Sequence, residues 1–208
     1  NVGTYEITQG TLAASANYNL VFTGADLTIT KATVTVTADA QSKVYGEADP
    51  SLTYQVSGLV GSDALTGALS RDAGENVGTY EITQGTLKAS DNYDLVFNGA
   101  DLTITKATVT VTADSQSKVY GETDPSLTYQ VSGLVGSDAL TGTLTRDAGE
   151  NVGTYAITKG TLAASSNYDL VFTGANLTIN QKVLSVDNIV ANITEQTYDG
   201  DTTLTTPR

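Results

Sequence analysis

A repeat of 75 residues organises this chain. The sequence Asn-Val-Gly-Thr-Tyr starts at Asn1 and recurs at Asn76 and at Asn151. A fixed period of this size is typical of arrays in which one folded unit is copied along the chain. We therefore expect a C-terminal part of a preceding repeat at 1–31, complete β repeats at 32–106 and 107–181, and the N-terminal part of a different β domain at 182–208.

The two complete copies differ mainly in small or polar residues. Ala40 stands against Ser115 and Glu81 against Ala156, whereas no large apolar residue differs between the copies. A conserved set of apolar side chains beside a drifting polar set indicates copies that share one core.

The pattern of apolar residues predicts an all-β domain. Val and Thr alternate through 108–113, and similar alternation at 127–131 and 152–158 gives six or seven short strands per unit, separated by Gly- and Asp-rich turns. We expect small β-sandwich-like domains in an elongated array. The alternative is a β-grasp-like unit with one short helical turn at 137–140.

The stretch 92–105 predicts a β-hairpin. Asn98-Gly99 suits the two central positions of a type I′ turn. With these residues at the tip, the apolar side chains of both strands fall on one face. The expected pairs are Phe97 with Ala100, Leu95 with Leu102, and Tyr93 with Ile104. The stretches 17–30 and 167–180 predict the same hairpin, with Thr-Gly at the tip.

The composition excludes several classes of function. The chain contains no Cys, His, Met or Trp, which rules out disulfides, thiolate or imidazole catalysis, and zinc or haem ligation by those side chains. Its net charge of −13 would repel nucleic acid and anionic membranes. No apolar run is long enough to span a bilayer. The chain opens in mid-pattern without a signal peptide, which indicates an excerpt.

Three motifs in fixed order resemble a known repeat. They are Val-Tyr-Gly-Glu-(Ala/Thr)-Asp-Pro-Ser-Leu-Thr-Tyr, Asn-Val-Gly-Thr-Tyr-x-Ile-Thr and Asn-Tyr-Asp-Leu-Val-Phe-x-Gly-Ala-x-Leu-Thr-Ile. Over about residues 1–181 the chain is similar to tandem MBG domains of the Tyr-Gly-x type, found in large filamentous-haemagglutinin-like surface and biofilm-matrix adhesins of bacteria. The tail from Val190, with Tyr-Asp-Gly at its centre, resembles the opening of the related Tyr-Asp-Gly-type domain.

The resemblance implies a non-enzymatic stalk or spacer outside the cell, and it offers no catalytic residues. Such a stalk would project a binding region and contact neighbouring repeats, other copies of the adhesin or exopolysaccharide. The alternative is a binding array, in which every copy holds a weak site for a glycan or a neighbouring stalk and affinity comes from multivalency. Nothing in the sequence combines a nucleophile with a base.

Acidic turns are the candidate metal sites. We expect no cofactor, with Ca²⁺ as the alternative, because calcium takes oxygen ligands from flexible loops. Solvated turn carboxylates are the interpretation that we prefer, since the spacing matches no known calcium loop. The candidate ligands are Glu47, Asp49, Asp72 and Glu75 in the first complete repeat, and Glu122, Asp124, Asp147 and Glu150 in the second.

Two lysines, Lys43 and Lys118, occupy equivalent positions inside the complete repeats. Two interpretations follow. The preferred one is a lysine at a strand edge that discourages pairing with another chain. The other is an isopeptide bond to a nearby Asn, for which Asn76 and Asn92 are the available partners in the first repeat.

The junctions between repeats are short. Lys106-Ala107 separates the last expected strand of one repeat from the first of the next, and Lys31-Ala32 does the same earlier in the chain. Two residues span at most about 7 Å. Successive repeats must therefore touch end to end, and we expect a rigid, extended array.

Overall fold

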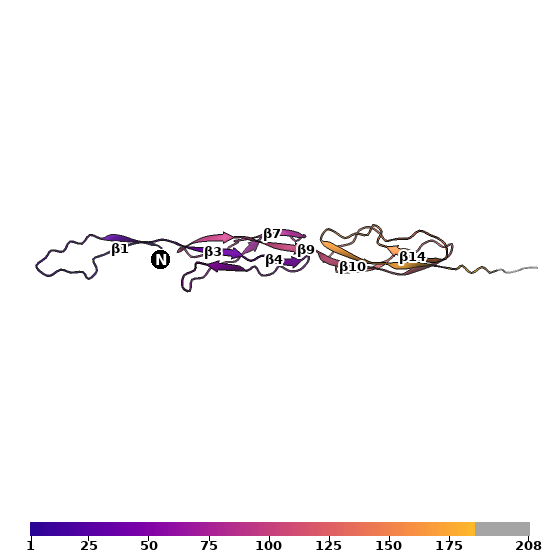
Figure 1. The fold of residues 1–208 in the computed structure, drawn as a ribbon, viewed down its shortest axis with the longest axis horizontal. Coiled ribbons are helices and arrows are strands. Elements are labelled where there is room, and N and C mark those ends of the chain that lie inside the picture. Colours follow the sequence, from indigo (N-terminus) through magenta and orange to yellow (C-terminus); the bar gives the residue numbers. More distant parts are fainter. Residues whose placement is uncertain (186–208) are drawn as a thin grey trace, which may run out of the picture.

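A computed structural model describes residues 1–185, which form strands, turns and loops without a helix (Figure 1). The N-terminal part contains β1 (Gly3–Ile7) and β2 (Ala25–Ile29). The first complete repeat contains β3 (Ala32–Ala38), β4 (Gln41–Val44), β5 (Tyr54–Ser57), β6 (Ser70–Arg71), β7 (Gly78–Thr83), β8 (Tyr93–Asn98) and β9 (Ala100–Thr105). The second contains β10 (Ala107–Ala113), β11 (Gln116–Val119), β12 (Tyr129–Ser132), β13 (Thr145–Arg146), β14 (Gly153–Thr158), β15 (Tyr168–Thr173) and β16 (Ala175–Asn180).

Each complete repeat folds into two small sheets, which confirms the all-β prediction. In the first repeat the strand orders are β5-β3-β8 and β4-β9-β7-β6, and the second repeat has the corresponding orders β12-β10-β15 and β11-β16-β14-β13. Strands β4 and β11 were not among the predicted strands. The short helical turn considered at 137–140 is absent. A β-turn is found there instead, in which the Asp138 amide donates to the Val135 carbonyl at 3.0 Å.

The predicted hairpin at 92–105 is wrong in its pairing. β8 and β9 belong to different sheets and do not pair with each other. Leu95 lies opposite Val34 in a parallel pairing of β8 with β3. Leu102 lies opposite Tyr80 on β7 and Gln41 on β4. Strands β15 and β16 in the second repeat are separated in the same way.

Gly99 is where the chain crosses from one sheet to the other. Its φ is not in the positive range that a type I′ turn requires. A Cβ on Gly99 would lie 3.0 Å from the Ile82 carbonyl oxygen, and one on Gly174 would lie 2.8 Å from the Ile157 carbonyl oxygen. These glycines therefore permit a close approach to the neighbouring strand.

The core of each repeat lies where its two sheets meet. In the second repeat it consists of Val111, Ala113, Leu144, Ile157, Leu162, Leu177 and Ile179. In the first repeat Tyr93, Leu102 and Ile104 are buried as predicted, whereas Leu95 and Phe97 face inward but remain half-buried. The sequence pattern thus identified the correct faces of these strands.

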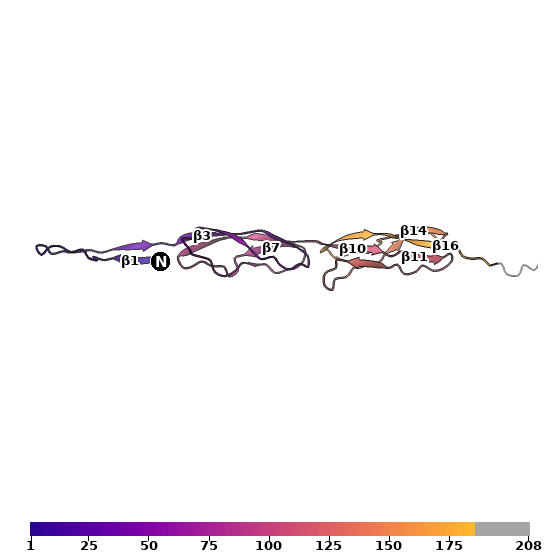
Figure 2. The ribbon, with the colours of Figure 1, turned by 90° about the horizontal axis from the view of Figure 1, so that it is seen from below.

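The repeats follow one another in a thin, elongated molecule (Figures 1 and 2). Within a repeat, β3 and then β4 run parallel to β8 and then β9. Ala32 begins the repeat beside Tyr93, and Thr105 ends it beside Val44. The chain consequently enters each repeat at one end of its long axis and leaves it at the other.

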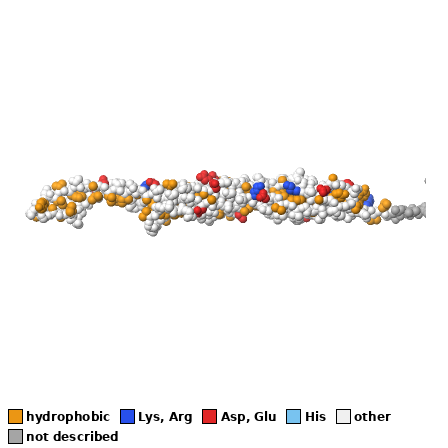
Figure 3. Space-filling model, viewed as in Figure 1, with side chains coloured by type: hydrophobic (Ala, Val, Ile, Leu, Met, Phe, Trp, Pro, Cys, Tyr) orange, Lys and Arg blue, Asp and Glu red, His pale blue; other side chains and the backbone are white. Residues whose placement is uncertain are grey.

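Residues 1–31 form only the β1–β2 pair and the loop between the two strands. Their large apolar side chains, among them Leu27 and Ile29, are exposed. Figure 3 shows this dense apolar surface at the end of the molecule formed by the β1 segment. The expected domain at 182–208 lies, from residue 186 onward, outside the described residues.

Candidate functional site

The junction between repeats is the most elaborate polar site in the described part of the chain. Lys106 alone separates β9 from β10, so the loops of the two repeats are brought into contact. The Lys106 ammonium also reaches Asp169 on β15 at 3.0 Å, and Lys31 reaches Asp94 at 3.2 Å at the preceding junction. The same arrangement of charges is thus present at both junctions.

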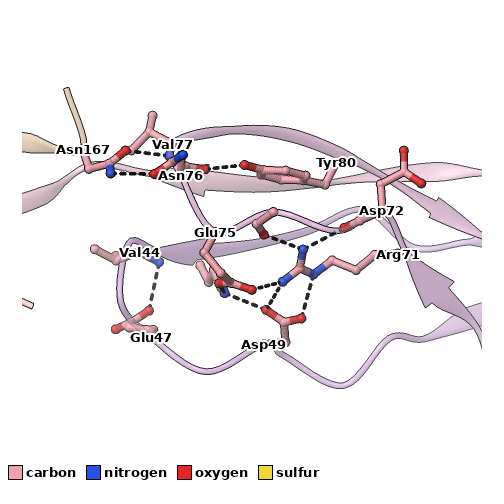
Figure 4. A network of polar contacts seen from close by, with 12 residues as sticks. Val44, Glu47, Asp49, Arg71, Asp72, Glu75, Asn76, Val77, Tyr80 and Asn167 are labelled. Carbon is pink, nitrogen blue, oxygen red and sulfur yellow. Dashed lines mark hydrogen bonds and ion pairs between the residues drawn. The ribbon is translucent and has the colours of Figure 1, made fainter. Parts of the chain in front are cut away.

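An asparagine joins each pair of neighbouring units. The Asn167 Oδ1 accepts the Val77 amide at 3.0 Å, and its Nδ2 donates to the Asn76 Oδ1 at 2.9 Å (Figure 4). Its backbone carbonyl accepts the Ala107 amide. Because Asn167 is buried, these bonds replace those that water would have made.

The earlier junction uses the equivalent residue in the same way. The Asn92 Oδ1 accepts the Val2 amide at 2.9 Å, and the Asn92 Nδ2 donates to the Asn1 Oδ1 at 3.2 Å. Asn76 and Asn92, considered above as isopeptide partners, thus belong to the junctions.

A tyrosine from one repeat inserts into the next. Tyr45 packs edge-on against Tyr168 with the ring centroids 5.4 Å apart. Both hydroxyls donate to the same oxygen of Asp138, from Tyr45 at 3.0 Å and from Tyr168 at 2.6 Å. The Tyr168 hydroxyl also accepts the Val135 amide at 2.8 Å. We call the Val135, Asp138 and Tyr168 set the socket of the second repeat, and Val60, Asp63 and Tyr93 form the equivalent socket of the first.

Both tyrosines are held in the protonated form that this geometry needs. The hydrogen bond to Asp138, followed by burial, raises the pKa of Tyr45. Burial, followed by the hydrogen bond to Asp138, raises the pKa of Tyr168. Both phenols therefore remain neutral donors to the shared carboxylate at physiological pH.

Gly46 makes the insertion sterically feasible. Its φ is 86°, and a Cβ would lie 2.5 Å from the Val135 Cγ2 of the next repeat. A larger residue would be strained in its backbone and would clash across the junction. The Tyr-Gly pair thus supplies a side chain that fills the socket and a backbone that allows close approach.

An ion cluster supports the turn that carries Tyr45. The Lys43 Nζ lies 2.6 Å from Asp49 and 2.5 Å from Glu75. Arg71 binds both oxygens of Asp49, at 2.7 and 3.0 Å, and contacts Glu75 at 2.5 Å (Figure 4). Its guanidinium also lies over the ring of Tyr80, 5.5 Å from the centroid.

The same cluster recurs in the second repeat. Lys118 and Arg146 contact Asp124 and Glu150 at distances of 2.5 to 3.0 Å. Two cations and two carboxylates balance each other in each cluster. The cations are the buried members, since the Lys43 side chain is only 3% exposed, whereas the carboxylates face solvent.

The cluster shifts the pKa of each member toward its charged form. Hydrogen bonds from Arg71 and then Lys43 lower the pKa of Asp49 to about 2. Hydrogen bonds from Asp49 and Glu75 raise the pKa of Lys43. In the second repeat Arg146 and Lys118 lower the pKa of Asp124 to about 2 in the same way.

The acidic residues that were considered as calcium ligands lie in ion pairs and turns. Asp49 and Glu75 are engaged by Lys43 and Arg71, and the Glu47 carboxylate accepts the Val44 amide at 2.9 Å. Asp72 contributes its carbonyl to Arg71 and its amide to Glu81. In residues 1–185 no group of three or more acidic side chains is placed to hold a metal ion.

The interpretation of Lys43 as a lysine at a strand edge that discourages pairing with another chain stays a prediction. Its strand β4 does lie at a sheet edge, but its side chain turns inward to the two carboxylates. An isopeptide bond requires a neutral amine and a protonated acid. The pKa of Lys43 is raised and that of Asp49 is lowered, which is the opposite of this requirement.

The residues that form the junction could not be recognised from the sequence. Tyr45, Asp138 and Asn167 come from parts of the chain far apart in sequence, so no local motif links them. One signal was available, namely the presence of the Tyr-Gly pair and of Asn-Tyr in both complete repeats. This repetition shows which residues the two copies share, but it does not show which of them contact each other.

The fold and the junctions define a tandem array of small all-β domains joined end to end. The chain belongs to the MBG domain family of the YGX type, whose model matches residues 34–103 and 109–178 and so covers more than half of the sequence. No curated protein and no solved structure matches the chain. Within the described residues, no helix has the length and apolar character needed to cross a membrane.

Proposed function

We propose that this chain is part of the stalk of a large extracellular bacterial adhesin or biofilm-matrix protein, where it acts as a stiff spacer. MBG domains form surface-adhesin-like repeat regions and are generally non-catalytic structural modules. In this role the repeats hold a binding region at a distance from the cell surface. The residues of the junctions and of the ion clusters hold neighbouring repeats in one orientation.

The observation that carries the proposal is the contact across the junction. A flexible linker would leave the facing loops of two repeats independent of each other. Here Tyr45 fills a socket built by the next repeat, and Asn167 binds two groups of the preceding one. Bending the array at Lys106 would break these contacts together, so the junction favours one orientation.

The ion cluster supports the same role. It joins the turn that carries Tyr45 to the segment that Asn167 contacts, because Lys43 and Arg71 both bind Glu75, which directly precedes Asn76 (Figure 4). The two parts of the first repeat that contact the second, the turn with Tyr45 and the segment with Asn76, are thus held by one ion cluster. The same ion cluster is present in the second repeat, which supports junctions that are all built in the same way.

Distance measurement between spin labels tests the stiffness directly. The chain has no Cys, so Thr37→Cys and Thr112→Cys introduce the only labelling sites, at equivalent exposed positions on β3 and β10. We expect a narrow distance distribution centred on the order of 30–40 Å, the length expected for one repeat of short strands and turns.

A control variant carries a Gly-Ser insertion after Lys106. We expect the insertion to broaden the distribution strongly, because Gly-Ser chains are flexible. A distribution for the uninterrupted chain as broad as that of the insertion variant would contradict the stiff-spacer role.

A further inference from the structure

Two tyrosines from different repeats touch each other at the junction. The ring centroids of Tyr45 and Tyr168 lie 5.4 Å apart, and the ring planes are inclined at 82° to each other. This is the edge-to-face contact that aromatic pairs favour. In residues 1–185 no other pair of aromatic rings is in such contact. The junction thus holds side by side two phenols that are far apart in the sequence.

The hydroxyl ends of the two rings also share one base. The Asp138 Oδ2 accepts the Tyr45 hydroxyl at 3.0 Å and the Tyr168 hydroxyl at 2.6 Å. Both distances suit a carboxylate that takes a proton from its hydrogen-bond partner. A phenol loses an electron more readily when a base accepts its proton in the same step. The carboxylate therefore favours the oxidation of either ring.

The composition of the chain directs oxidation toward tyrosine. Cys, Met, Trp and His, the other side chains that common oxidants attack, are absent from the sequence. In the described part of the chain, Tyr45 and Tyr168 alone combine a ring-to-ring contact with a shared carboxylate. Groups that are held in contact react with each other far faster than groups that meet by diffusion. A radical formed on one ring therefore has the other ring as its nearest partner.

We propose that the junction is a site of oxidative cross-linking, at which a one-electron oxidant joins Tyr45 to Tyr168 as dityrosine. The oxidant belongs to the class of peroxide-driven or photochemical oxidants and acts from solution. Its product is a covalent bond between one repeat and the next, in addition to the non-covalent contacts described above. The reaction is a property of the junction itself and does not depend on the stalk role.

The reaction balances with the oxidant alone. Each phenol gives one electron to the oxidant and its hydroxyl proton to Asp138, which passes the proton to water. The two phenoxyl radicals form a bond between the ring carbons ortho to their oxygens. The hydrogen atoms on those carbons then move to the oxygens and restore both hydroxyls, so the product is lighter by two hydrogen atoms. Tyr45 is only half-buried, which leaves it within reach of an oxidant and free to turn from its edge-on orientation.

Photo-oxidation of the full chain tests the proposal. A dilute solution is illuminated with ruthenium tris(bipyridine) and persulfate, and gel filtration then separates single chains from cross-linked oligomers. We expect the single chains to show the fluorescence of dityrosine and an intact mass lower by two hydrogen atoms. Because trypsin cleaves after Lys and Arg, digestion should release the peptide 44–71 joined to the peptide 160–182.

Two matched substitutions identify the tyrosine that reacts. The peptide 44–71 contains Tyr45 and Tyr54, and the peptide 160–182 contains Tyr168 as its only tyrosine. Tyr45→Phe should abolish the joined peptides, whereas Tyr54→Phe should leave their yield unchanged. Oxidation of the chain in concentrated urea should also fail to produce them, because the contact between the rings is lost on unfolding.

Asp138→Asn tests the role of the carboxylate. An amide oxygen still accepts the two hydroxyls but does not take up a proton, so the cross-link should form about 100-fold more slowly, the effect of losing a positioned base. Circular dichroism verifies that this variant is folded. The proposal would be overturned by absence of the joined peptides from the unmodified chain, by their survival in Tyr45→Phe, by an equal yield from the unfolded chain, or by an unchanged rate in Asp138→Asn.

Discussion

At the scale of single residues, the ion clusters lead to a prediction of how the stability of the protein changes with acid. Asp49 and Asp124 have a pKa of about 2 in the folded chain, below the ordinary value of 3.8. A group whose pKa is lowered by folding stabilises the fold above its unfolded pKa. This stabilisation is lost as the pH falls through the folded pKa.

We expect the free energy of unfolding to drop between about pH 4 and pH 2 for this reason. Urea unfolding followed by circular dichroism at several pH values measures the drop. In an Arg71→Met, Arg146→Met variant the pKa of both aspartates should move back toward the ordinary value. The drop in this interval should then be smaller, and an unchanged drop would show that other carboxylates are responsible.

The same charges predict the covalent state of Lys43 and Lys118. Both ammonium groups are held charged by two carboxylates each, which removes the nucleophilic lone pair needed to form an amide. We expect the intact mass of the chain to equal the mass calculated from its sequence. A mass lower by one ammonia molecule per repeat, the group released when the lysine amine displaces the amide nitrogen of an asparagine, would demonstrate an isopeptide bond and contradict this account of the cluster.

At the scale of strands, alternation in the sequence identified the inward faces but not the neighbouring strands. Tyr93, Leu102 and Ile104 point inward in a hairpin and also when the chain crosses between sheets, so the apolar pattern fits both arrangements. The Thr-Gly pairs at Thr23 and Thr173 were the signal against a type I′ turn, because Thr tolerates positive φ poorly. Which strands pair with each other depends on contacts between segments far apart in the repeat. A local sequence pattern carries no information about those contacts.

The candidate site was predictable to a similar extent. The recurring acidic turns were recognised, but their partners were not, because Arg71 and Lys43 approach Asp49 and Glu75 only after β4, β6 and the acidic turns come together. The isolated spacing of carboxylates fits a solvated turn, a metal ligand or an ion pair equally well. The fold decides among these through the position of the two cations.

A matched pair of substitutions tests the assignment of strands to the core. Leu102→Ala should cost about 2–5 kcal/mol of stability, the range for deleting a buried leucine and leaving a cavity. Val96→Ala also shortens an apolar side chain of this repeat, but on an outward-facing position of β8 that is 47% exposed, and should leave stability nearly unchanged. Thermal unfolding of both variants provides the comparison, and equal effects would refute the assignment.

At the scale of the whole molecule, the junction couples the two complete repeats. Asn167→Ala removes both side-chain bonds to the preceding repeat and leaves the Val77 amide and the Asn76 side chain without these partners. We expect a loss of about 1–3 kcal/mol, since two partly buried hydrogen bonds are lost and each contributes about 0.5–1.5 kcal/mol. Calorimetry should then resolve two unfolding transitions in place of one.

Asn98→Thr serves as the control for this variant, because the second repeat already has Thr173 at the equivalent exposed position. It should leave the unfolding profile unchanged. If Asn167→Ala also unfolded in the same single transition at the same temperature, the repeats would be coupled by other contacts, or not at all.

The parallel course of the strands has a consequence for a chain pulled at its ends. Tension enters a repeat at Ala32 on β3 and leaves it at Thr105 on β9, which continues directly from β8. Since β3 pairs with β8 in parallel along the pulling direction, the force shears the whole ladder at once and cannot open its bonds one by one. Single-molecule stretching should therefore show abrupt, high-force steps of equal contour length, one for each repeat, so that a tether built from such units resists drag without yielding gradually.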